Sequence, residues 1–410
     1  MASPTTNPTP YAPDLSNWLL CFAIGDADCF CSEFVEDHHP VVAEALKFER
    51  YQEHPVWGPN GVYGNSRGSR DSVWPGQYTD DTQMTIAVAE AFLAGRAHSA
   101  PELADAFVRT FRRDRRQGYS AGLQGVIGEV ADGQELLTRL HGRNDSEKNG
   151  AAMRSLVYGF ASTFAEVAQL AILGARITHD TAAGVSSAHA IAIMSHFAIW
   201  EPERPFAQYG EALVRARPDG YHGDWNTLPR EGRVVGASFK PADTESLGWR
   251  TVRAVLHVLR AIEESWCVNN DTSGPRPEQG RPESPSPEED QGIRAQLGAG
   301  SQALRARPEG ARDPSRRLGE NQLRDAMKIV LEMGGDTDTV GALVCGILGL
   351  RGASPEGWMV DGLENPSMNP SYDPAWGSRF GARYLQNLGA RLAARVRKVE
   401  ITYGSASRSY

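Results

Sequence analysis

Long apolar runs with helical spacing dominate this 410-residue sequence. In the segment 101–114, large apolar side chains recur at intervals of three and four and lie on one face of a helix: Leu103, Phe107, Val108 and Phe111. Similar runs, rich in Ala and Gly, occur at 79–95, 151–177, 182–200, 247–266, 323–333 and 339–350. Several are apolar all round, which is typical of helices buried on most sides. Alternation with period two is rare, and only the C-terminal VRKVEITYG hints at a strand. The sequence therefore predicts an all-α protein, a compact multi-helix bundle.

The runs define one domain, which we expect over residues 14–388, followed by a tail at 389–410. Residues 1–13 contain four prolines and no apolar pattern, so we expect a disordered leader. The segment 270–320 contains PRPEQGRPESPSPEEDQG and has no aromatic residue. It cannot bury enough apolar surface to offset the entropy lost on ordering, so we predict a disordered insertion.

Composition excludes several classes of protein. The net charge of −9 argues against nucleic acid as a partner, because phosphate binding needs clustered Lys and Arg. No run approaches the roughly 18 apolar residues that cross a bilayer, so we expect no membrane association. The N-terminal residues show no secretory pattern, and the five cysteines suggest neither a disulfide framework nor a zinc site. We expect a cytoplasmic protein.

Two acidic clusters each come directly before an apolar helix. The first is Thr79-Asp80-Asp81-Thr82, and the second contains Asp336-Thr337-Asp338-Thr339. Asp and Thr are preferred helix caps, so one explanation is capping alone. However, buried carboxylates in this number would repel one another unless some protonate or cations are present. Oxygen ligands without Cys or His favour Mg²⁺, with Mn²⁺ possible, and two clusters match a site with two ions.

The motifs together resemble a known family. These are YTDDTQMTIAVAEA (78–91), NGAAMRS (149–155), Thr-His at 178–179 and GGDTDTVGALVCGI (334–347). Their order and identity are similar to the ADP-ribosylglycohydrolase family, which includes dinitrogenase reductase-activating glycohydrolase and the ADP-ribosylarginine hydrolases. The resemblance covers about residues 18 to 350. It implies an orthogonal all-α bundle, a binuclear Mg²⁺ centre and cleavage of the bond between ADP-ribose and its acceptor. We expect a monomer that binds ADP-ribose and an ADP-ribosylated protein.

Carried over by position, the resemblance implies six metal ligands: Thr79, Asp80, Asp81, Asp336, Asp338 and Thr339. Glu33 aligns with a carboxylate that acts in proton transfer or gates the metal site in some members. Here the sequence departs from the family, since Asp28, Cys29 and Cys31 replace Leu, Gly and Pro-like positions. Without the resemblance, Glu33 is equally explained as a solvated charge beside a helix. We expect Glu33, Asp80 and Asp81 to be the catalytic residues.

The resemblance also implies a substrate-binding segment. It assigns contacts with ADP-ribose to Asn149, Gly150, Ala151 and Met153, at a small-residue turn before a helix, and to His179. A helix start with exposed N–H groups can hold a diphosphate. An ordinary helix start with Met153 in the core, and a hydrogen-bonded structural histidine, remain alternatives. Arg154 could pair with an internal carboxylate, and the RRDRR run at 112–116 is expected to be a solvated helix face.

The sequence thus predicts a Mg²⁺-dependent hydrolase that removes ADP-ribose from modified side chains, with arginine as the first choice of acceptor. The transition state would resemble the oxocarbenium ion of glycoside hydrolysis, with Glu33 or Asp80 moving the proton. A serine or other O-linked acceptor is one alternative. A non-catalytic ADP-ribose-binding or structural member, as among lens crystallins that resemble this family, is another.

Overall fold

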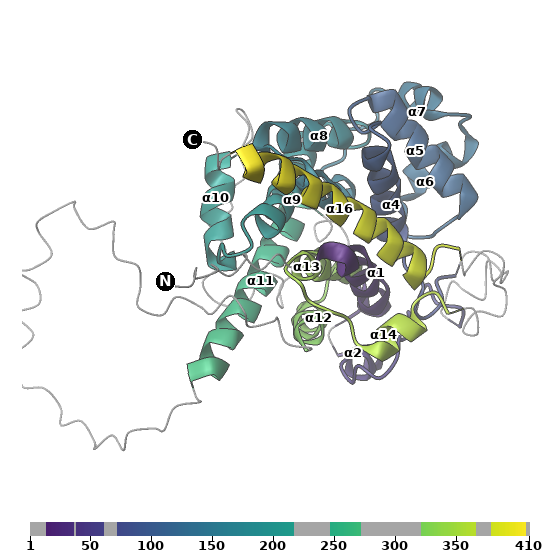
Figure 1. Ribbon diagram of the computed structural model, residues 1–410. Helices are drawn as coiled ribbons and strands as arrows, with labels where there is room; N and C mark the ends of the chain where they lie inside the picture. Colours follow the sequence, from purple (N-terminus) through teal and green to yellow (C-terminus); the bar gives the residue numbers. More distant parts are fainter. Residues whose placement is uncertain are drawn as a thin grey trace, which may run out of the picture. The chain divides into compact units, whose positions relative to one another are not determined.

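The fold was analysed in a computed structural model. The structure describes residues 14–36, 38–60, 72–216, 247–271, 321–365 and 379–406, without the side chains of 266–271 and 397–406 (Figure 1). Within these ranges the secondary structure is helical, and no strand forms beyond two isolated bridges, Asp145–His179 and Lys148–Leu247. The all-α prediction is confirmed. The predicted leader at 1–13 and residues 272–320 of the predicted insertion lie outside the described residues.

The described α-helices are, in chain order, α1 (Trp18–Cys29), α2 (Pro40–Ala45), α4 (Asp80–Leu93), α5 (Ala100–Arg113), α6 (Ala121–Glu129), α7 (Gly133–Leu140), α8 (Phe164–Arg176), α9 (Ala182–Trp200), α10 (Tyr209–Ala216), α11 (Gly248–Asp271), α12 (Gln322–Met333), α13 (Thr337–Leu350), α14 (Gly357–Gly362) and α16 (Ala382–Ala406). Short 3₁₀ helices are η1 (Leu15–Asn17), η2 (Phe30–Ser32), η3 (Asn149–Ala151), η4 (Ser155–Phe160) and η5 (Phe206–Gln208). The chain divides into two units, 1–263 with 317–410 and 264–316. Of the second unit, only the end of α11 is described.

Helices α1 and α13 form a closely packed pair, seen side by side in Figure 1. A Cβ atom added at Gly25 would lie 2.2 Å from the carbonyl oxygen of Gly341, so only glycine permits this approach. At the other end of the pair, a Cβ atom added at Gly349 would lie 2.8 Å from the Cα of Trp18. The two helices are therefore antiparallel, and the end of α1 lies beside the start of α13.

Helix α9 is apolar on all sides because other elements surround it. It packs against α8 and η4. Among the described helices, α9 alone is long and apolar enough to cross a membrane by length and composition, but 89% of its apolar window is buried inside the protein. His189 and His196, seven residues apart on α9, are both buried. Protein contacts thus account for the composition of α9.

Two predictions of secondary structure are wrong. The segment VRKVEITYG (396–404) belongs to α16, although its alternation hinted at a strand. Upstream, buried residues three and four apart establish the helix, and extending an existing helix costs less free energy than starting a new one. These residues are Leu385, Leu388, Leu392 and Val396. Helix α16 also runs through the predicted domain end at 388. The second difference is at 149–160, where two short 3₁₀ helices replace the expected α-helix.

Candidate metal centre and active site

The first acidic cluster lies at the start of α4, as predicted. Thr79 is the N-cap, and its hydroxyl accepts from the N–H of Asp81. The carboxylate of Asp26, from α1, accepts hydrogen bonds from the N–H and hydroxyl of both Thr79 and Thr82, at 2.6 to 3.1 Å. Asp26, the hydroxyl of Thr79 and the carbonyl oxygen of Gln117 together accept the free N–H groups at the start of α4. This leaves the carboxylates of Asp80 and Asp81 available for another role.

The second cluster lies at the start of α13. Gly334 and Gly335 both adopt positive φ, 69° and 85°, and lead the chain into Asp336, the N-cap. The hydroxyl of Thr337 donates to the carbonyl oxygen of Cys29 at 2.7 Å and accepts from Ser32 at 3.1 Å. These bonds fix the start of α13 against the end of α1. The short 3₁₀ helix η2 then leads directly to Glu33.

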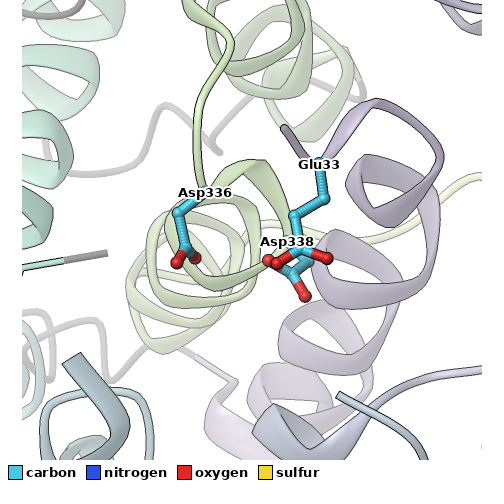
Figure 2. Close-up of side chains that lie close together, drawn as sticks. All are labelled: Glu33, Asp336 and Asp338. Carbon is cyan, nitrogen blue, oxygen red and sulfur yellow. The ribbon is translucent and has the colours of Figure 1, made fainter. Parts of the chain in front are cut away.

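The structure brings the two clusters together. Carboxylate oxygens of Glu33, Asp336 and Asp338 lie within 4.8 Å of one another, and Figure 2 shows these side chains converging. The side chain of Thr339 interacts with both Asp81 and Asp336, which links the start of α4 to the start of α13. All six predicted ligands are buried: Thr79, Asp80, Asp81, Asp336, Asp338 and Thr339. Residues more than 250 positions apart therefore form one acidic site.

Burial and mutual repulsion disfavour ionisation of this site. Burial, followed by the charges of Asp26 and neighbouring acids, raises the pKa of Asp80 and Asp81 well above the usual value. Burial and then Glu33 raise the pKa of Asp338 in the same way, and burial raises that of Asp336. Two like charges about 4 Å apart repel by about 4 kcal/mol at an effective dielectric constant near 20. The carboxylates can all be ionised only if cations neutralise them.

The residues present fit a hard divalent cation. One oxygen of Asp81, Oδ1, and one of Asp336, Oδ1, are buried without a hydrogen-bond partner among the described residues. Unsatisfied buried carboxylate oxygens are costly unless a cation or proton meets them. The donor set consists of carboxylates and hydroxyls, which suits Mg²⁺ or Mn²⁺ rather than zinc. Capping alone does not explain these free oxygens.

Glu33 is held at the edge of the acidic site. It is half-buried, and burial together with Asp336 and Asp80 raises its pKa well above the usual value. His54 accepts the N–H groups of Val56 and Trp57 through Nδ1, so its Nε2–H donates to the carbonyl oxygen of Glu33 at 2.9 Å. On the other side, the N–H of Phe34 donates to the carbonyl oxygen of Gly335 at 2.8 Å. Glu33 is therefore a fixed part of the site and not a solvated charge.

The predicted substrate-binding residues adjoin the acidic site through Asn149. Its side chain hydrogen-bonds with Asp336, and its Nδ2 donates to the hydroxyl of Thr251 at 3.1 Å. A Cβ atom added at Gly150 would lie 2.8 Å from Cε1 of His179, so the imidazole ring covers this glycine. Asn149, Gly150 and His179 therefore lie together, although they come from η3 and from the turn before α9.

His179 is neutral and is held through Nδ1. Burial, with the charge of Arg154, lowers its pKa to about 3. Arg154 donates to the hydroxyl of Thr178 at 2.6 Å, and the same hydroxyl is hydrogen-bonded to Nδ1 of His179 at 2.7 Å. Arg154 thus fixes the imidazole ring beside Gly150 through Thr178. Arg154 also donates to the carbonyl oxygens of Gly150 and Gly174, and among the described residues it forms no ion pair with a carboxylate.

Ala151 and Met153 expose less surface to a ligand than their predicted contact with ADP-ribose requires. Ala151 is 1% exposed within a cluster that includes Ala175, Val185 and Ala188, and Met153 is 4% exposed. Their side chains belong to the core. A ligand at this wall would reach Asn149, Gly150 and His179, together with backbone atoms.

The predicted solvated face at 112–116 is only partly confirmed, because Arg112 and Arg115 are exposed whereas Arg116 is buried. Helix α5 ends at Arg113, where the chain turns, so the last arginine points inward. Arg112 donates to the carbonyl oxygens of Val130 and Ala131, Arg113 pairs with Glu90 at 2.8 Å, and the side chain of Arg116 is 1% exposed.

Comparisons with known proteins show the family of this chain. The sequence matches the ADP-ribosylglycohydrolase family over residues 16–399. The chain belongs to this family. It is 32% identical to ADP-ribosylhydrolase ARH3 of Mus musculus over 131 residues, which cover 30% of this chain and 35% of that protein. It is 24% identical to ADP-ribosylhydrolase ARH3 of Gallus gallus over 339 residues, 78% of this chain and 81% of that protein.

A solved structure is also similar. The protein titled "ADP-ribosylglycohydrolase-related protein complex" aligns with a TM-score of 0.48 and 16% identity, over 93% of this chain and 97% of that one. The match with the mouse protein spans only about a third of that relative's length.

The sequence alone did not indicate that Asp26 and His54 are part of this site. Asp26 lies in the segment IGDADCFCSEFVE (24–36), close to Glu33, but it carries no ligand motif of its own, and its role depends on the packing of α1 beside α4. His54 lies in a turn without helical pattern and acts on Glu33 only through a backbone carbonyl oxygen. The sequence gives one indication that Asp26 has a buried polar role: this aspartate stands within an apolar helix, α1.

Proposed function

We propose that this protein is a Mg²⁺-dependent hydrolase that releases ADP-ribose from modified protein side chains, with Mn²⁺ able to replace Mg²⁺. The convergence of Glu33, Asp336 and Asp338 beside Asp81, with two buried carboxylate oxygens unpartnered in the described chain, supports it. Membership of the ADP-ribosylglycohydrolase family supports the same reaction class. The acidic site and the Asn149–His179 wall are adjacent, as cleavage of an ADP-ribosyl bond requires.

Six residues would hold two ions: Thr79, Asp80, Asp81, Asp336, Asp338 and Thr339. When bound, divalent ions supply Lewis acidity, orient the ribose hydroxyls and lower the pKa of water. The chain supplies a preformed frame for this chemistry. Asp26 and Thr79 fix the start of α4, and Thr337 fixes the start of α13 against α1. The ligands therefore do not need to reorganise when the substrate binds.

Glu33 and Asp80 are the candidates for moving a proton. Burial and neighbouring acids raise the pKa of both carboxyl groups, which favours the protonated form that a proton donor to the leaving group needs. Glu33 is the more accessible of the two and is held by His54. Cleavage at the anomeric carbon develops positive charge on the ribose, and ionised carboxylates beside it stabilise that charge.

The wall formed by Asn149, Gly150 and His179 would bind the ADP-ribose moiety. Because burial keeps His179 neutral, its imidazole can hydrogen-bond without placing a buried charge beside the substrate. Lys148 adds a positive charge that acts on Glu33 and Asp336 and can attract a diphosphate. The acidic character of the site favours a cationic acceptor, so ADP-ribosyl-arginine is the first substrate we propose.

The deciding experiment pairs metal titration with product release. Isothermal titration with Mg²⁺, Mn²⁺ and ADP-ribose is followed by chromatographic detection of ADP-ribose released from ADP-ribosyl-arginine and ADP-ribosyl-serine proteins. Asp81→Asn and Asp336→Asn should each reduce metal affinity and turnover by about 100-fold, while helicity by circular dichroism stays near wild type. Asp105→Asn is the control, since Asp105 lies on α5 and pairs with Arg109 at 2.7 Å.

The outcomes separate the alternatives. ADP-ribose binding without any release would favour a non-catalytic binding protein. Release from the serine-linked substrate alone would make the arginine proposal wrong and keep the hydrolase. Absence of both metal and ADP-ribose binding would contradict the proposed function altogether.

A further inference from the structure

The loop that follows α5 buries an arginine in a bidentate ion pair. Arg116 donates to both carboxylate oxygens of Glu364, at 2.7 and 3.0 Å, and the two side chains are 1% and 0% exposed. Arg116 also donates twice to Asp114, at 2.8 and 2.9 Å. Burial alone would lower the pKa of Arg116, but Glu364, Tyr78 and Asp114 outweigh it and raise that pKa. The pair joins residues 248 positions apart.

This ion pair holds the residue that comes directly before the first acidic cluster. The N–H of Tyr78 donates to Oε1 of Glu364 at 3.0 Å, and the carbonyl oxygen of Tyr78 accepts from Arg116 at 3.4 Å. The guanidinium of Arg116 also lies 4.0 Å from the centre of the Tyr78 ring. Both polar groups of the Tyr78 backbone are thus bound by the pair, and the next residue is Thr79.

Backbone groups next to Arg116 and at Glu364 also contact the chain around Tyr78. The N–H of Asp80 donates to the carbonyl oxygen of Gln117 at 2.9 Å, one residue beyond Arg116. Gly118 has φ of 105°, and a Cβ atom there would lie 2.0 Å from Oδ1 of Asp80, so the loop touches this carboxylate closely. From the other side, the N–H of Glu364 donates to the carbonyl oxygen of Gly76 at 2.9 Å. Residues 76–80 are therefore enclosed by the loops at 114–118 and 362–364.

We propose that Arg116 and Glu364 are positioning residues that set the geometry of the metal-ligand turn Thr79–Asp81. The proposal rests on the proposed function, because it assumes that this turn binds the metal. A buried ion pair contributes little net stability compared with apolar residues of the same volume. It does impose a defined geometry, since the planar guanidinium meets both oxygens of one carboxylate. Here that geometry is transmitted to the turn through the backbone of Tyr78.

The test compares two substitutions at Glu364. Glu364→Gln keeps an oxygen that can accept the N–H of Tyr78, whereas Glu364→Leu removes it, and Asp114 remains as the ionic partner of Arg116 in both. We expect Glu364→Leu to weaken Mn²⁺ affinity about 10- to 100-fold and Glu364→Gln by less, the range found for residues that orient metal ligands. Affinity and ligand symmetry are measured by isothermal titration and by the electron paramagnetic resonance spectrum of bound Mn²⁺. A purely structural role would lower the melting temperature without changing that spectrum.

Arg324→Met is the matched control. Arg324 also pairs with a glutamate, Glu356, at 2.5 Å, and its partner is not bound to the turn. Metal affinity should be unchanged in this variant. Mn²⁺ affinity and spectrum equal to wild type in a folded Glu364→Leu protein would overturn the positioning role. If Glu364→Leu does not fold, an unchanged affinity and spectrum in Arg116→Lys, which keeps the charge but cannot form the bidentate pair, overturns it instead. Wild-type protein that binds neither Mg²⁺ nor Mn²⁺ would contradict the proposed function itself.

Discussion

Asp26 and Asp28 lie two residues apart in α1, and both are fully buried, but their surroundings differ. Asp26 accepts hydrogen bonds from Thr79 and Thr82, which oppose the effect of burial and leave its pKa at about 6. Oδ2 of Asp28 has no hydrogen-bond partner among the described residues, and burial raises its pKa to about 8. At neutral pH, Asp28 is therefore a neutral acid beside Cys29 and Cys31, and the folded state opposes its ionisation.

This difference predicts a pH-dependent stability. The unfolded chain releases the proton of Asp28 near pH 4, while the folded chain keeps it up to about pH 8. Between these values the folded state binds more protons, so the free energy of unfolding decreases as pH rises. Asp28→Asn, which is neutral at all pH values, should make that decrease shallower. Urea unfolding at pH 5, 7 and 8.5 with a chelator present measures this difference between variant and wild type. Parallel curves for the two proteins would show that Asp28 does not titrate in this range.

At the scale of elements, the antiparallel contact of α1 with α13 places the acidic residues. Gly25 and Gly341 let the two backbones meet. Because Glu33 follows the end of α1 and Asp336 comes directly before α13, this contact brings the two carboxylates together. The helix starts themselves were predictable, since Asp and Thr before an apolar run indicate a cap. Which helix starts would meet was not predictable, because their meeting depends on two glycines, one in each helix, that let the backbones come into contact. The family resemblance supplied that pairing.

A methyl group at this contact should therefore disturb the site. In Gly341→Ala, the added Cβ would lie 2.6 Å from Sγ of Cys29 and 2.7 Å from the carbonyl oxygen of Gly25, so the helices must move apart. Overpacking of this kind costs about 1–3 kcal/mol in the free energy of unfolding. We expect weaker Mg²⁺ binding as well, because Asp336 and Asp338 move with α13. Chemical unfolding and metal titration measure the two effects. Gly125→Ala in α6, where no atom lies within 4 Å of the added Cβ, tests whether any glycine loss produces them.

At the scale of the whole molecule, sequence pattern and tertiary structure carry different information. Periodicity placed the apolar helices, and burial at Leu103, Phe107, Val108 and Phe111 agrees with it. Periodicity could not predict the direction of Arg116, since a run of arginines at a helix end is usually solvated. Arg116 points inward because it pairs with Glu364, which lies much later in the sequence. Such long-range polar pairs have no local pattern, so the sequence predicts candidate ligands but not the residues that would orient them.

The composition of residues 272–318 gives a prediction at the same scale. The segment is rich in proline and charge and lacks aromatic residues, so we expect it to add nothing to the folded core. Replacing it with a flexible linker of about 12 Gly and Ser residues should leave the melting temperature, Mg²⁺ affinity and release of ADP-ribose within about twofold of wild type. A second protein, with the same residues in scrambled order, keeps length and composition. If both proteins fail to fold, the segment has a specific structural role and the prediction of disorder is wrong. If only the shortened protein fails, the length of the connection between α11 and α12 is what the fold requires.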